Sequence, residues 1–329
     1  MSAMAKMTDR RRGRTQIVNL DQIMTDQQIK EEKWTLTTLS AAVNTKENCM
    51  LWLARRRLIK NSAYCTTCHQ SAYLNAYAEG TDGFRWACRS CHFRRTIRDN
   101  SFFARSHIPI VHLLLLIYCW SHDMPIFNIS HETKISTEYA MNYCNTCREE
   151  CEKYIYRHRL SEIGGLGEDG EPIIVDINES KNFKRKYVTR ESRWVFGGIE
   201  RHSRKCFLVE IPNNTVASLT EAIKKHILPG THIVSHRNSL CAYISDINNG
   251  TYSHSEVKMD NFTDPKYDVV HAINVEKMWM RAKRFLEKQF GTTTVQFSTC
   301  LNEFIFRNSI KKEHIFGTVL VAIAEDYVV

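Results

Sequence analysis

The sequence lacks the two hydrophobic features that direct a chain to a membrane. Its N-terminus carries charge early, at Lys6 and in the run RRRGR (Arg10 to Arg14), and has no apolar core, so we predict no secretory signal peptide. The longest apolar run, Ile108 to Trp120, is interrupted by His112 and is too short to span a bilayer. We therefore expect no membrane partner, and we interpret this run as a buried helix.

Internal repeats and low-complexity segments are also missing, and the 329 residues suffice for two or three domains. Without a secretory signal, the 12 cysteines favour a reducing compartment, in which they bind metal or are simply buried. The formal net charge of +9 is a moderate basic excess. It favours an anionic partner without naming one, because many basic proteins bind no nucleic acid.

The most specific motif is a pair of Cys-x-x-Cys sequences, Cys65 to Cys68 and Cys88 to Cys91, separated by 19 residues. Each offers two thiolates from a tight turn, and strand-forming residues around a turn lie between them, as in a zinc ribbon. The pattern predicts a structural Zn²⁺ ion. The basic flank HFRRTIR (His92 to Arg98) either faces phosphates or is simply solvated. The four predicted zinc ligands are Cys65, Cys68, Cys88 and Cys91.

The N-terminal part of the chain is expected to be a disordered basic tail (residues 1–15), a helical segment (16–62) and the zinc ribbon (63–100). The run RRRGR is typical of a nuclear-localisation or phosphate-contacting patch, and a solvated terminus is the alternative. For a eukaryotic source we therefore expect a nuclear location.

Residues 101–162 are predicted to be helical and similar in order to a helix-turn-helix. A helix over Ile108 to Trp120 is followed by a short one through Ile126 to His131. Ser136 is placed to cap a long helix that ends near Arg159. Many helical hairpins share this order, so it does not by itself establish DNA binding. Three cysteines share one face of the long helix, where they either form a second metal site or pack in the core. Core packing is favoured because no fourth metal ligand is evident. These cysteines are Cys144, Cys147 and Cys151.

A glycine-rich stretch, residues 163–171, is predicted to be a linker to a final domain over residues 172–329. In that domain three consecutive strands precede a helix, a fourth strand and further helices. This order is typical of an RNase H-like α/β domain. The expected elements are strands at Ile173 to Ile177, Trp194 to Glu200 and Cys206 to Ile211, a helix capped by Thr215, a strand at Ile233 to Ser235, and a helix from Val275 to Phe290.

The chain resembles DDE transposases of the Merlin superfamily and the related ISXO-like insertion-sequence transposases, over roughly Thr45 to Ile310. The resemblance implies an RNase H-like transposase domain preceded by a zinc ribbon and a helix-turn-helix-like segment. The stretches that carry it are VDINESKNFKRKY (Val175 to Tyr187), WVFGGIERHSRKCFLVEIPN (Trp194 to Asn213), HILPGTHIVSH (His226 to His236) and HAINVEKMWMRAKR (His271 to Arg284).

Members of these families cut and join DNA with two metal ions held by three acidic residues. By position, the first two acids of the family correspond to Asn178 and His236 in this chain, and the third corresponds to Glu276. An amide is neutral, and imidazole suits Zn²⁺ better than Mg²⁺, so the triad is degenerate. Asp176, two residues before Asn178, is a possible surrogate on the same strand face.

These residues predict a transposase-derived, zinc-containing DNA-binding protein without strand-transfer activity. One alternative is an active nuclease or transposase that uses Asp176 and Glu276 with Mg²⁺ or Mn²⁺. Another is a protein-interaction module built on an inert fold. The expected partners are double-stranded DNA, including transposon terminal inverted repeats, and further copies of the chain, since transposases often act as dimers or higher assemblies.

Overall fold

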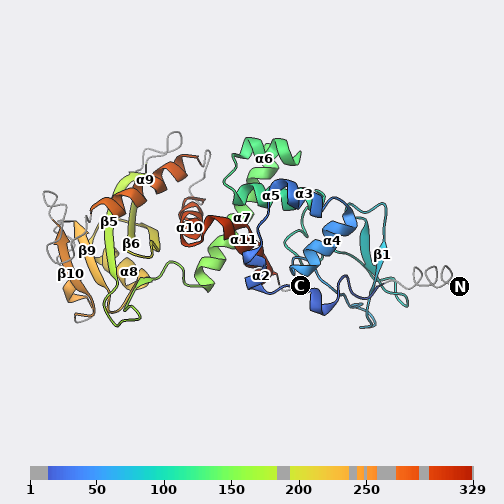
Figure 1. Ribbon diagram of the computed structural model, residues 1–329, viewed down its shortest axis with the longest axis horizontal. Helices are drawn as coiled ribbons and strands as arrows, with labels where there is room; N and C mark the ends of the chain where they lie inside the picture. The colour runs from blue at the N-terminus through green and yellow to red at the C-terminus, as the bar shows by residue number, and fades with distance from the viewer. Residues whose placement is uncertain are drawn as a thin grey trace. The chain divides into compact units, whose positions relative to one another are not determined.

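The computed structural model describes residues 14–183, 193–236, 243–247, 250–257, 272–288 and 296–327. The chain divides into two compact units (Figure 1). The first consists of Met1–Glu150 together with Lys312–Val329, and the second of Cys151–Lys311. Most of the predicted basic tail lies outside the described residues. Its last arginine, Arg14, accepts a hydrogen bond from the Leu74 amide and so belongs to the first unit.

The first unit begins with short helices whose starts are fixed by threonine caps. Thr25, Thr35 and Thr45 each accept a hydrogen bond from the backbone amide three residues further on, which satisfies a donor that has no partner within the helix. Phe316 of the C-terminal helix stacks with Trp52 at 6.5 Å between ring centroids. The helices are η2 (Leu20–Gln22), α2 (Asp26–Glu31), α3 (Leu36–Ala42), α4 (Lys46–Arg55), η5 (Lys312–His314) and α11 (Ile315–Asp326).

The predicted ribbon contains a small antiparallel sheet of three strands, β1 (Tyr73–Ala76), β2 (Phe84–Ala87) and β3 (Arg94–Thr96). Leu74 of β1 pairs with Trp86 of β2, and both side chains are buried. A sheet of this size buries little apolar surface. It therefore depends on other sources of stability, such as a bound metal.

Three helices follow in the predicted order: α5 (Ile110–Ser121), α6 (Ile126–Thr133) and α7 (Thr137–Arg157). The predicted cap of α7 is confirmed, because the Ser136 hydroxyl accepts a hydrogen bond from the Tyr139 amide at 3.3 Å. The three cysteines of α7 are buried, as expected. Among the described residues, we find no helix that combines the length and the apolar character needed to cross a membrane.

The second unit is built on a five-stranded sheet in the order β10-β9-β5-β6-β7. Strands β5, β6 and β7 pair antiparallel. Strand β9 pairs in parallel with β5, and β10 pairs in parallel with β9. This mixed α/β topology is the one expected of an RNase H-like domain. The strands are β5 (Ile174–Phe183), β6 (Arg193–Glu200), β7 (Cys206–Ile211), β9 (His232–His236) and β10 (Ser253–Val257).

The two faces of this sheet are covered by different helices. Val175, Ile177 and Phe207 lie on one face, in a core completed by Leu219 and Ile223 of α8 (Val216–His226). The other face is covered by α9 (Ala272–Lys288), which contacts β5 and β6, and α10 (Gln296–Ser309), which contacts β7. The predicted cap of α8 is confirmed, since the Thr215 hydroxyl accepts from the Ser218 amide at 3.4 Å.

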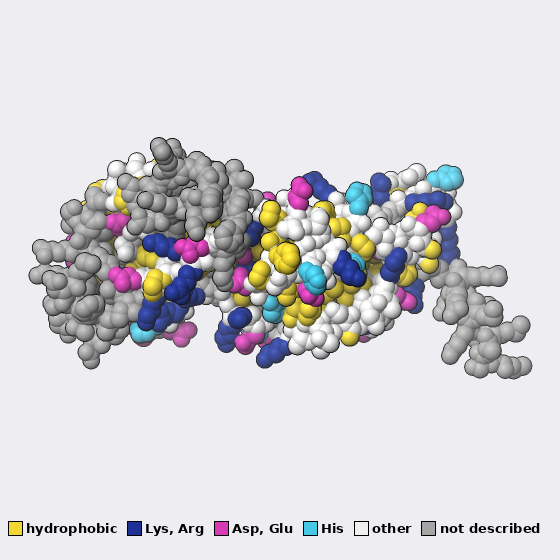
Figure 2. Space-filling view, turned by 90° about the horizontal axis from the view of Figure 1, so that it is seen from above, with side chains coloured by type: hydrophobic (Ala, Val, Ile, Leu, Met, Phe, Trp, Pro, Cys, Tyr) yellow, Lys and Arg dark blue, Asp and Glu magenta, His cyan; other side chains and the backbone are white. Residues whose placement is uncertain are grey.

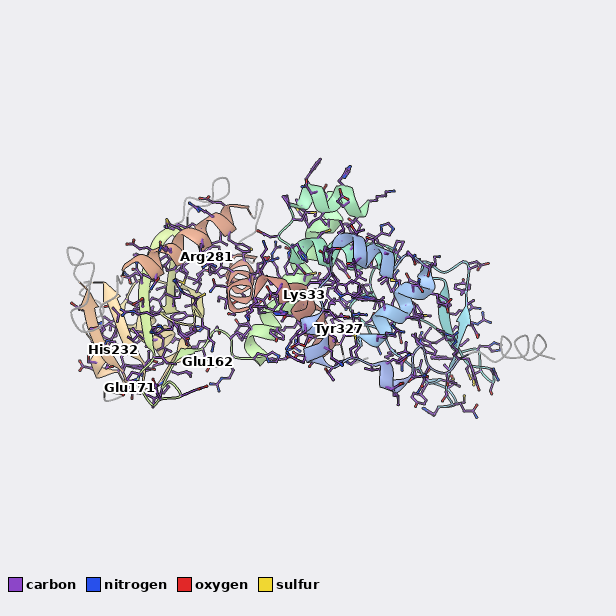
Figure 3. The ribbon with its side chains drawn as sticks, viewed as in Figure 1. Lys33, Glu162, Glu171, His232, Arg281 and Tyr327 are labelled. Atoms are coloured by element: carbon purple, nitrogen blue, oxygen red, sulfur yellow. The ribbon has the colours of Figure 1, made fainter. Side chains whose placement is uncertain are left out.

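Side chains tie the outer elements of the second unit to their neighbours. The imidazole of His232 in β9 bonds to the hydroxyls of Ser253 and Ser255 in β10 at 2.8 and 2.9 Å (Figure 3). On the other side of the sheet, Arg281 of α9 donates to the amide oxygen of Asn308 in α10 at 2.6 Å (Figure 3).

The glycine-rich stretch, predicted to be a linker between domains, lies inside the second unit, which begins at Cys151. Strand β4 (Ile163–Gly164) pairs in parallel with β8 (Ile227–Leu228), and residues 163–165 are buried. The Gly164 amide donates to Glu200 at 2.7 Å, and the Gly165 amide donates to the Thr231 hydroxyl at 2.7 Å. Gly164 has a φ of +85°, which only glycine adopts readily. Glycine is therefore needed here to hold one fixed backbone conformation, not to make the chain flexible.

The C-terminal boundary also differs from the prediction, which extended the second domain to residue 329. Helix α11 packs against α2 and α5 and belongs to the first unit. Its sequence is almost entirely apolar, and most of its side chains are buried. The apolar sequence of α11 predicts that the helix is buried, but it does not show which of the two units the helix packs against.

Candidate functional site

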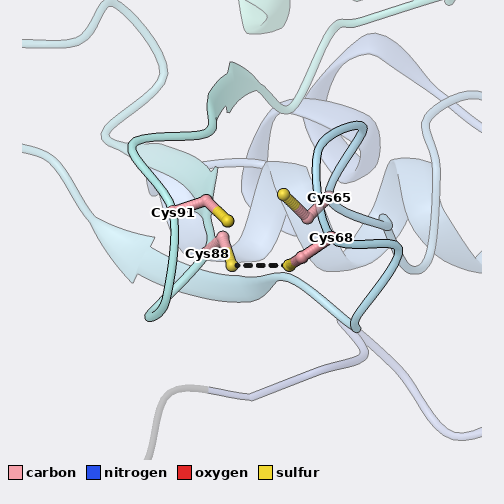
Figure 4. Close-up of side chains that lie close together, drawn as sticks. All are labelled: Cys65, Cys68, Cys88 and Cys91. Atoms are coloured by element: carbon pink, nitrogen blue, oxygen red, sulfur yellow. Dashed lines mark hydrogen bonds between the residues drawn. The ribbon is translucent and has the colours of Figure 1, made fainter.

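The four predicted zinc ligands converge. The sulfur atoms of Cys65, Cys68, Cys88 and Cys91 all lie within 4.8 Å of one another, and in Figure 4 they point toward a common centre. The Sγ atoms of Cys68 and Cys88 are 3.6 Å apart. Four sulfurs at about 2.3 Å from one tetrahedral zinc ion would be separated by about 3.8 Å. The cluster therefore has the size of a tetrahedral thiolate site.

Backbone hydrogen bonds hold both cysteine turns in shape. The Cys65 amide donates to the Gln70 carbonyl at 2.8 Å, and the Cys88 amide donates to the Phe93 carbonyl at 3.1 Å. The Thr67 amide donates to the Cys65 sulfur at 3.4 Å. This bond is stronger to a thiolate than to a thiol, so the turn is built for a charged sulfur.

The thiols of the cluster differ widely in acidity. Burial raises the pKa of Cys65, but the amides of Cys68 and Thr67 and the neighbouring thiols outweigh it and lower that pKa to about 6. The thiol of Cys68 raises the pKa of Cys91 to about 12. A metal ion displaces the remaining protons, because metals bind thiolates. The residues fit a structural zinc ion by donor type, number and spacing.

The basic flank of the ribbon splits into two kinds of arginine. Arg94 and Arg95 are exposed on β3. Arg98 is buried: it forms an ion pair with Asp82, 2.7 Å between Nη2 and Oδ1, and donates to the Ser106 and Ile108 carbonyls. The prediction that the whole flank either contacts phosphates or is solvated is wrong for Arg98, whose role is structural.

The first position of the predicted triad, Asn178, lies on β5 and is partly buried. Its Oδ1 atom accepts a hydrogen bond from the Glu179 amide at 2.8 Å. This oxygen is the atom that would coordinate a cation. It is neutral and already has one donor.

Asp176 is held by an arginine that the sequence did not single out. Its Oδ1 accepts from Nη2 of Arg201 at 3.0 Å and from Nε at 3.1 Å, and its Oδ2 lies 3.3 Å from Nε. The two side chains are only 5% and 4% exposed. Arg201 follows Glu200 in the stretch WVFGGIER, and this dipeptide at the end of a buried strand was the available signal.

His236 is the last residue of β9, and its backbone pairs with Val257 of β10. Ser235 pairs with Ile177, so His236 and Asn178 each lie one residue past this pair, on adjacent parallel strands. The structure thus brings the backbone positions of these two predicted residues together. The side chain of His236 lies outside the described residues.

Glu276 is exposed on α9, while its neighbours Val275, Met278 and Trp279 are buried. Met278 packs over Gly197, where a Cβ atom would lie 3.2 Å from the Met278 methyl group. Gly197 pairs with Asn178, so α9 crosses the face of the sheet that carries Asn178. The roles assigned to Asn178, His236, Glu276 and Asp176 remain predictions.

A comparison with protein-family models finds the class to which the second unit is similar. Residues 164–309 match the ISXO2-like transposase domain, which is a DDE transposase domain. The match covers the whole five-stranded sheet and helices α8 to α10. It supports the coarser part of the predicted resemblance, namely a DDE transposase domain of the ISXO2-like kind. A comparison with curated proteins gives no match.

Among solved structures, one similar chain comes from the "CryoEM structure of simian T-cell lymphotropic virus intasome in complex with PP2A regulatory subunit B56 gamma". It is 14% identical, with a TM-score of 0.32, and the match covers 58% of this chain and 67% of that chain. A likeness at this level carries no argument about function.

Proposed function

We propose that this chain is a transposase-derived, zinc-containing DNA-binding protein that has lost strand-transfer chemistry. One observation carries the proposal. The three acid positions of the family read Asn178, His236 and Glu276, and the nearby carboxylate of Asp176 is held by Arg201 in a buried ion pair. Glu276 is left without a second carboxylate assigned to the same metals.

Electrostatics explain why such a site would not hold two divalent ions. Mg²⁺ prefers oxygen ligands and is strongly hydrated, so it needs negative charge to stay bound. At an effective dielectric constant of about 20, each carboxylate about 4 Å from a unit charge contributes roughly 4 kcal/mol. Replacing two carboxylates with an amide and an imidazole removes most of this attraction. The buried pair of Asp176 supports the same conclusion, because freeing that carboxylate would strand the Arg201 charge.

Several observations support retained DNA binding. The chain carries a net charge of +9, the cysteine cluster fits zinc, and the match to a transposase domain implies a DNA partner. We propose double-stranded DNA, including terminal inverted repeats, as the ligand, and assembly of several copies on it. We further propose Merlin-superfamily ancestry, on the blocks WVFGGIER and HILPGT, and a nuclear location for a eukaryotic source, on the run RRRGR.

The catalytic part of the proposal is tested by nicking assays with Mg²⁺ or Mn²⁺ on an inverted-repeat duplex. The wild-type protein is expected to be inactive. The double variant Asn178→Asp with His236→Asp restores both carboxylates and is expected to gain metal-dependent nicking, which Glu276→Ala in the same background should remove. Nicking by the wild-type protein that Glu276→Ala abolishes would overturn the proposal.

A second candidate function, a protein-interaction module, is favoured by an apolar surface on the helical segment. Phe127 of α6 is 71% exposed and Met141 of α7 is 42% exposed. Figure 2 shows hydrophobic side chains in view over this segment. Titration of salt against duplex binding separates the two functions. Affinity that is negligible at low salt, or insensitive to salt, would favour the interaction module, because phosphate contacts release counterions.

A further inference from the structure

An open depression of about 580 Å³ lies on the ribbon, next to the cysteine cluster. Both cysteine turns contribute to its lining. Thr66 and Thr67 come from the first turn, while His92, Arg94 and Arg95 follow the second. Because one metal ion would bridge the two turns, it would also fix the distance between these two groups of side chains.

The residues that line this depression are two threonines, a cysteine of the cluster, a histidine, a phenylalanine and two arginines, and no Asp or Glu is among them. Arg94, Arg95 and both threonines are exposed. Within the part of the chain that the structure describes, neither arginine forms an ion pair with an acid. Such a set of donors is suited to an anion with several oxygen atoms, such as a phosphate group.

The charge of a zinc-loaded cluster does not cancel this positive surface. A zinc ion with four thiolates carries a formal charge of about −2. Besides the two arginines of the depression, the ribbon sheet and the second cysteine turn carry Arg85 and Arg89, so the ribbon has four arginines in addition to the buried Arg98. Positive charge therefore remains after the cluster is balanced.

Arginine side chains on this part of the ribbon rest on aromatic rings. Arg89 lies 3.7 Å from the ring centroid of Tyr73, and Arg85 lies 4.1 Å from that of Tyr77. In the depression itself, Arg95 lies 5.9 Å from the ring centroid of Phe93. Stacking restricts a guanidinium and leaves N–H groups at its edge available, which lowers the entropy lost when an anion binds. In Arg85 the Nε atom is buried, so only the terminal nitrogens could serve in this way.

The helical segment offers a weaker electrostatic surface. The exposed charges at the end of α6 and the start of α7 are mixed in sign, with Lys134 beside Glu132 and Glu138. A helix that enters a DNA groove needs contacts to phosphates on both sides of it, and acids in its first turn oppose them. The ribbon is the better phosphate-contacting element of the first unit.

We infer that this depression binds a phosphodiester group of the DNA backbone, with Arg94 and Arg95 as the principal contacts. The inference rests on the proposed DNA-binding function and names the surface that carries it. Contacts of this kind position the protein on DNA and carry no sequence information.

The test measures duplex affinity of the full chain as a function of salt, with the variant Arg94→Gln/Arg95→Gln. The matched control, Arg105→Gln/Lys134→Gln, removes the same charge from exposed positions elsewhere in the first unit. Loss of the contact to this one phosphodiester group should lower the slope of log K against log salt by about 1 and the affinity at low salt by about 10-fold. The control should change the affinity at low salt by no more than about 3-fold and should leave the slope close to that of the wild-type protein.

A second variant protects the test against loss of the ribbon fold. Thr66→Asp keeps both arginines and adds a carboxylate to the opposite side of the depression, so it should also weaken binding. Zinc content is measured for each variant. Weaker duplex binding by a variant that retains zinc is attributed to the changed side chain and not to loss of the ribbon fold. If the wild-type protein binds duplex but both depression variants match the control, the inference fails and the proposed function stands. If the wild-type protein binds no duplex, both fail.

Discussion

Asp176 and Arg201 form a buried ion pair in the second unit, with nitrogen–oxygen distances of 3.0 to 3.3 Å. The Arg201 amide also donates to the carbonyl of Ile174, two residues before Asp176 on the same strand, at 3.1 Å. The ion pair engages both oxygen atoms of the Asp176 carboxylate. The surrogate role that its position on β5 suggested stays a prediction.

The pair should be important for stability in one specific way. Arg201→Met leaves the Asp176 charge buried without its partner and is expected to lower the free energy of unfolding by about 3–5 kcal/mol. Adding Asp176→Leu removes both charges and should recover much of this loss. The measurement is urea unfolding. Arg159→Met breaks an exposed pair with Glu162 and should have a much smaller effect, because water screens it. Equal losses in the single and double variants would contradict the interpretation.

Zinc in the cysteine cluster is expected at about one equivalent per chain in freshly purified protein. Cys88→Ser removes one thiolate and should reduce zinc content and expose the ribbon to proteolysis, since metal binding supplies folding free energy. Cys300→Ala, a buried cysteine of α10 outside the cluster, is the control and should retain zinc. Metal analysis and limited proteolysis give the answer. Less than about half an equivalent in the wild-type protein would count against the ribbon.

Gly164 should not tolerate a side chain. A Cβ atom there would lie 2.9 Å from Cγ2 of Thr231, and the φ of +85° would add backbone strain. Gly164→Ala is expected to destabilise the second unit by roughly 3 kcal/mol or more, as both terms add. Gly170 has a similar φ of +80° but open space around it, so Gly170→Ala should cost about 1 kcal/mol. Thermal unfolding compares the two. Similar losses would mean that strain alone decides.

His226 should make stability depend on pH. Burial lowers the pKa of its imidazole, which stacks on Phe207 at 5.0 Å and bonds through Nδ1 to the Ser161 carbonyl at 3.1 Å. Nε2 is buried and has no hydrogen-bond partner among the described residues. The Ser161 carbonyl and Glu162 oppose this lowering, and Lys225 adds to it.

Because the folded state prefers the neutral ring, this contribution is present above the ordinary pKa and is lost as pH falls through the lowered one. Urea midpoints at about pH 8 and about pH 5 should therefore differ less in His226→Phe than in the wild-type protein. His202→Phe, at an exposed position in the same unit, serves as control and should behave like the wild type. If the pH dependence of stability is the same in His226→Phe as in the wild-type protein, it arises from other titratable groups.

Features that depend on nearby residues could be predicted from the sequence. Ser136 and Thr215 cap helices because a hydroxyl reaches an amide three residues away, and the cysteine spacing defined the cluster. Features that depend on distant residues could not. The partner of Asp176 lies 25 residues away and that of Gly165 lies 66 residues away. Composition made residues 163–171 look like a linker between domains, although Gly164 and Gly165 pack inside the second unit.

The position of α11 has a consequence for the order in which the protein folds. As the chain leaves the ribosome, the second unit, Cys151–Lys311, is synthesised before the helix that completes the first. Until then Trp52 and Tyr118 lack their contacts with Phe316, so apolar surface of the first unit stays open. Domains usually mature from the N-terminus onward, but here the second unit can reach its native state earlier. A premature stop before α11 would therefore spare the transposase-like domain and leave the unit with the cysteine cluster as a substrate for chaperones and proteases.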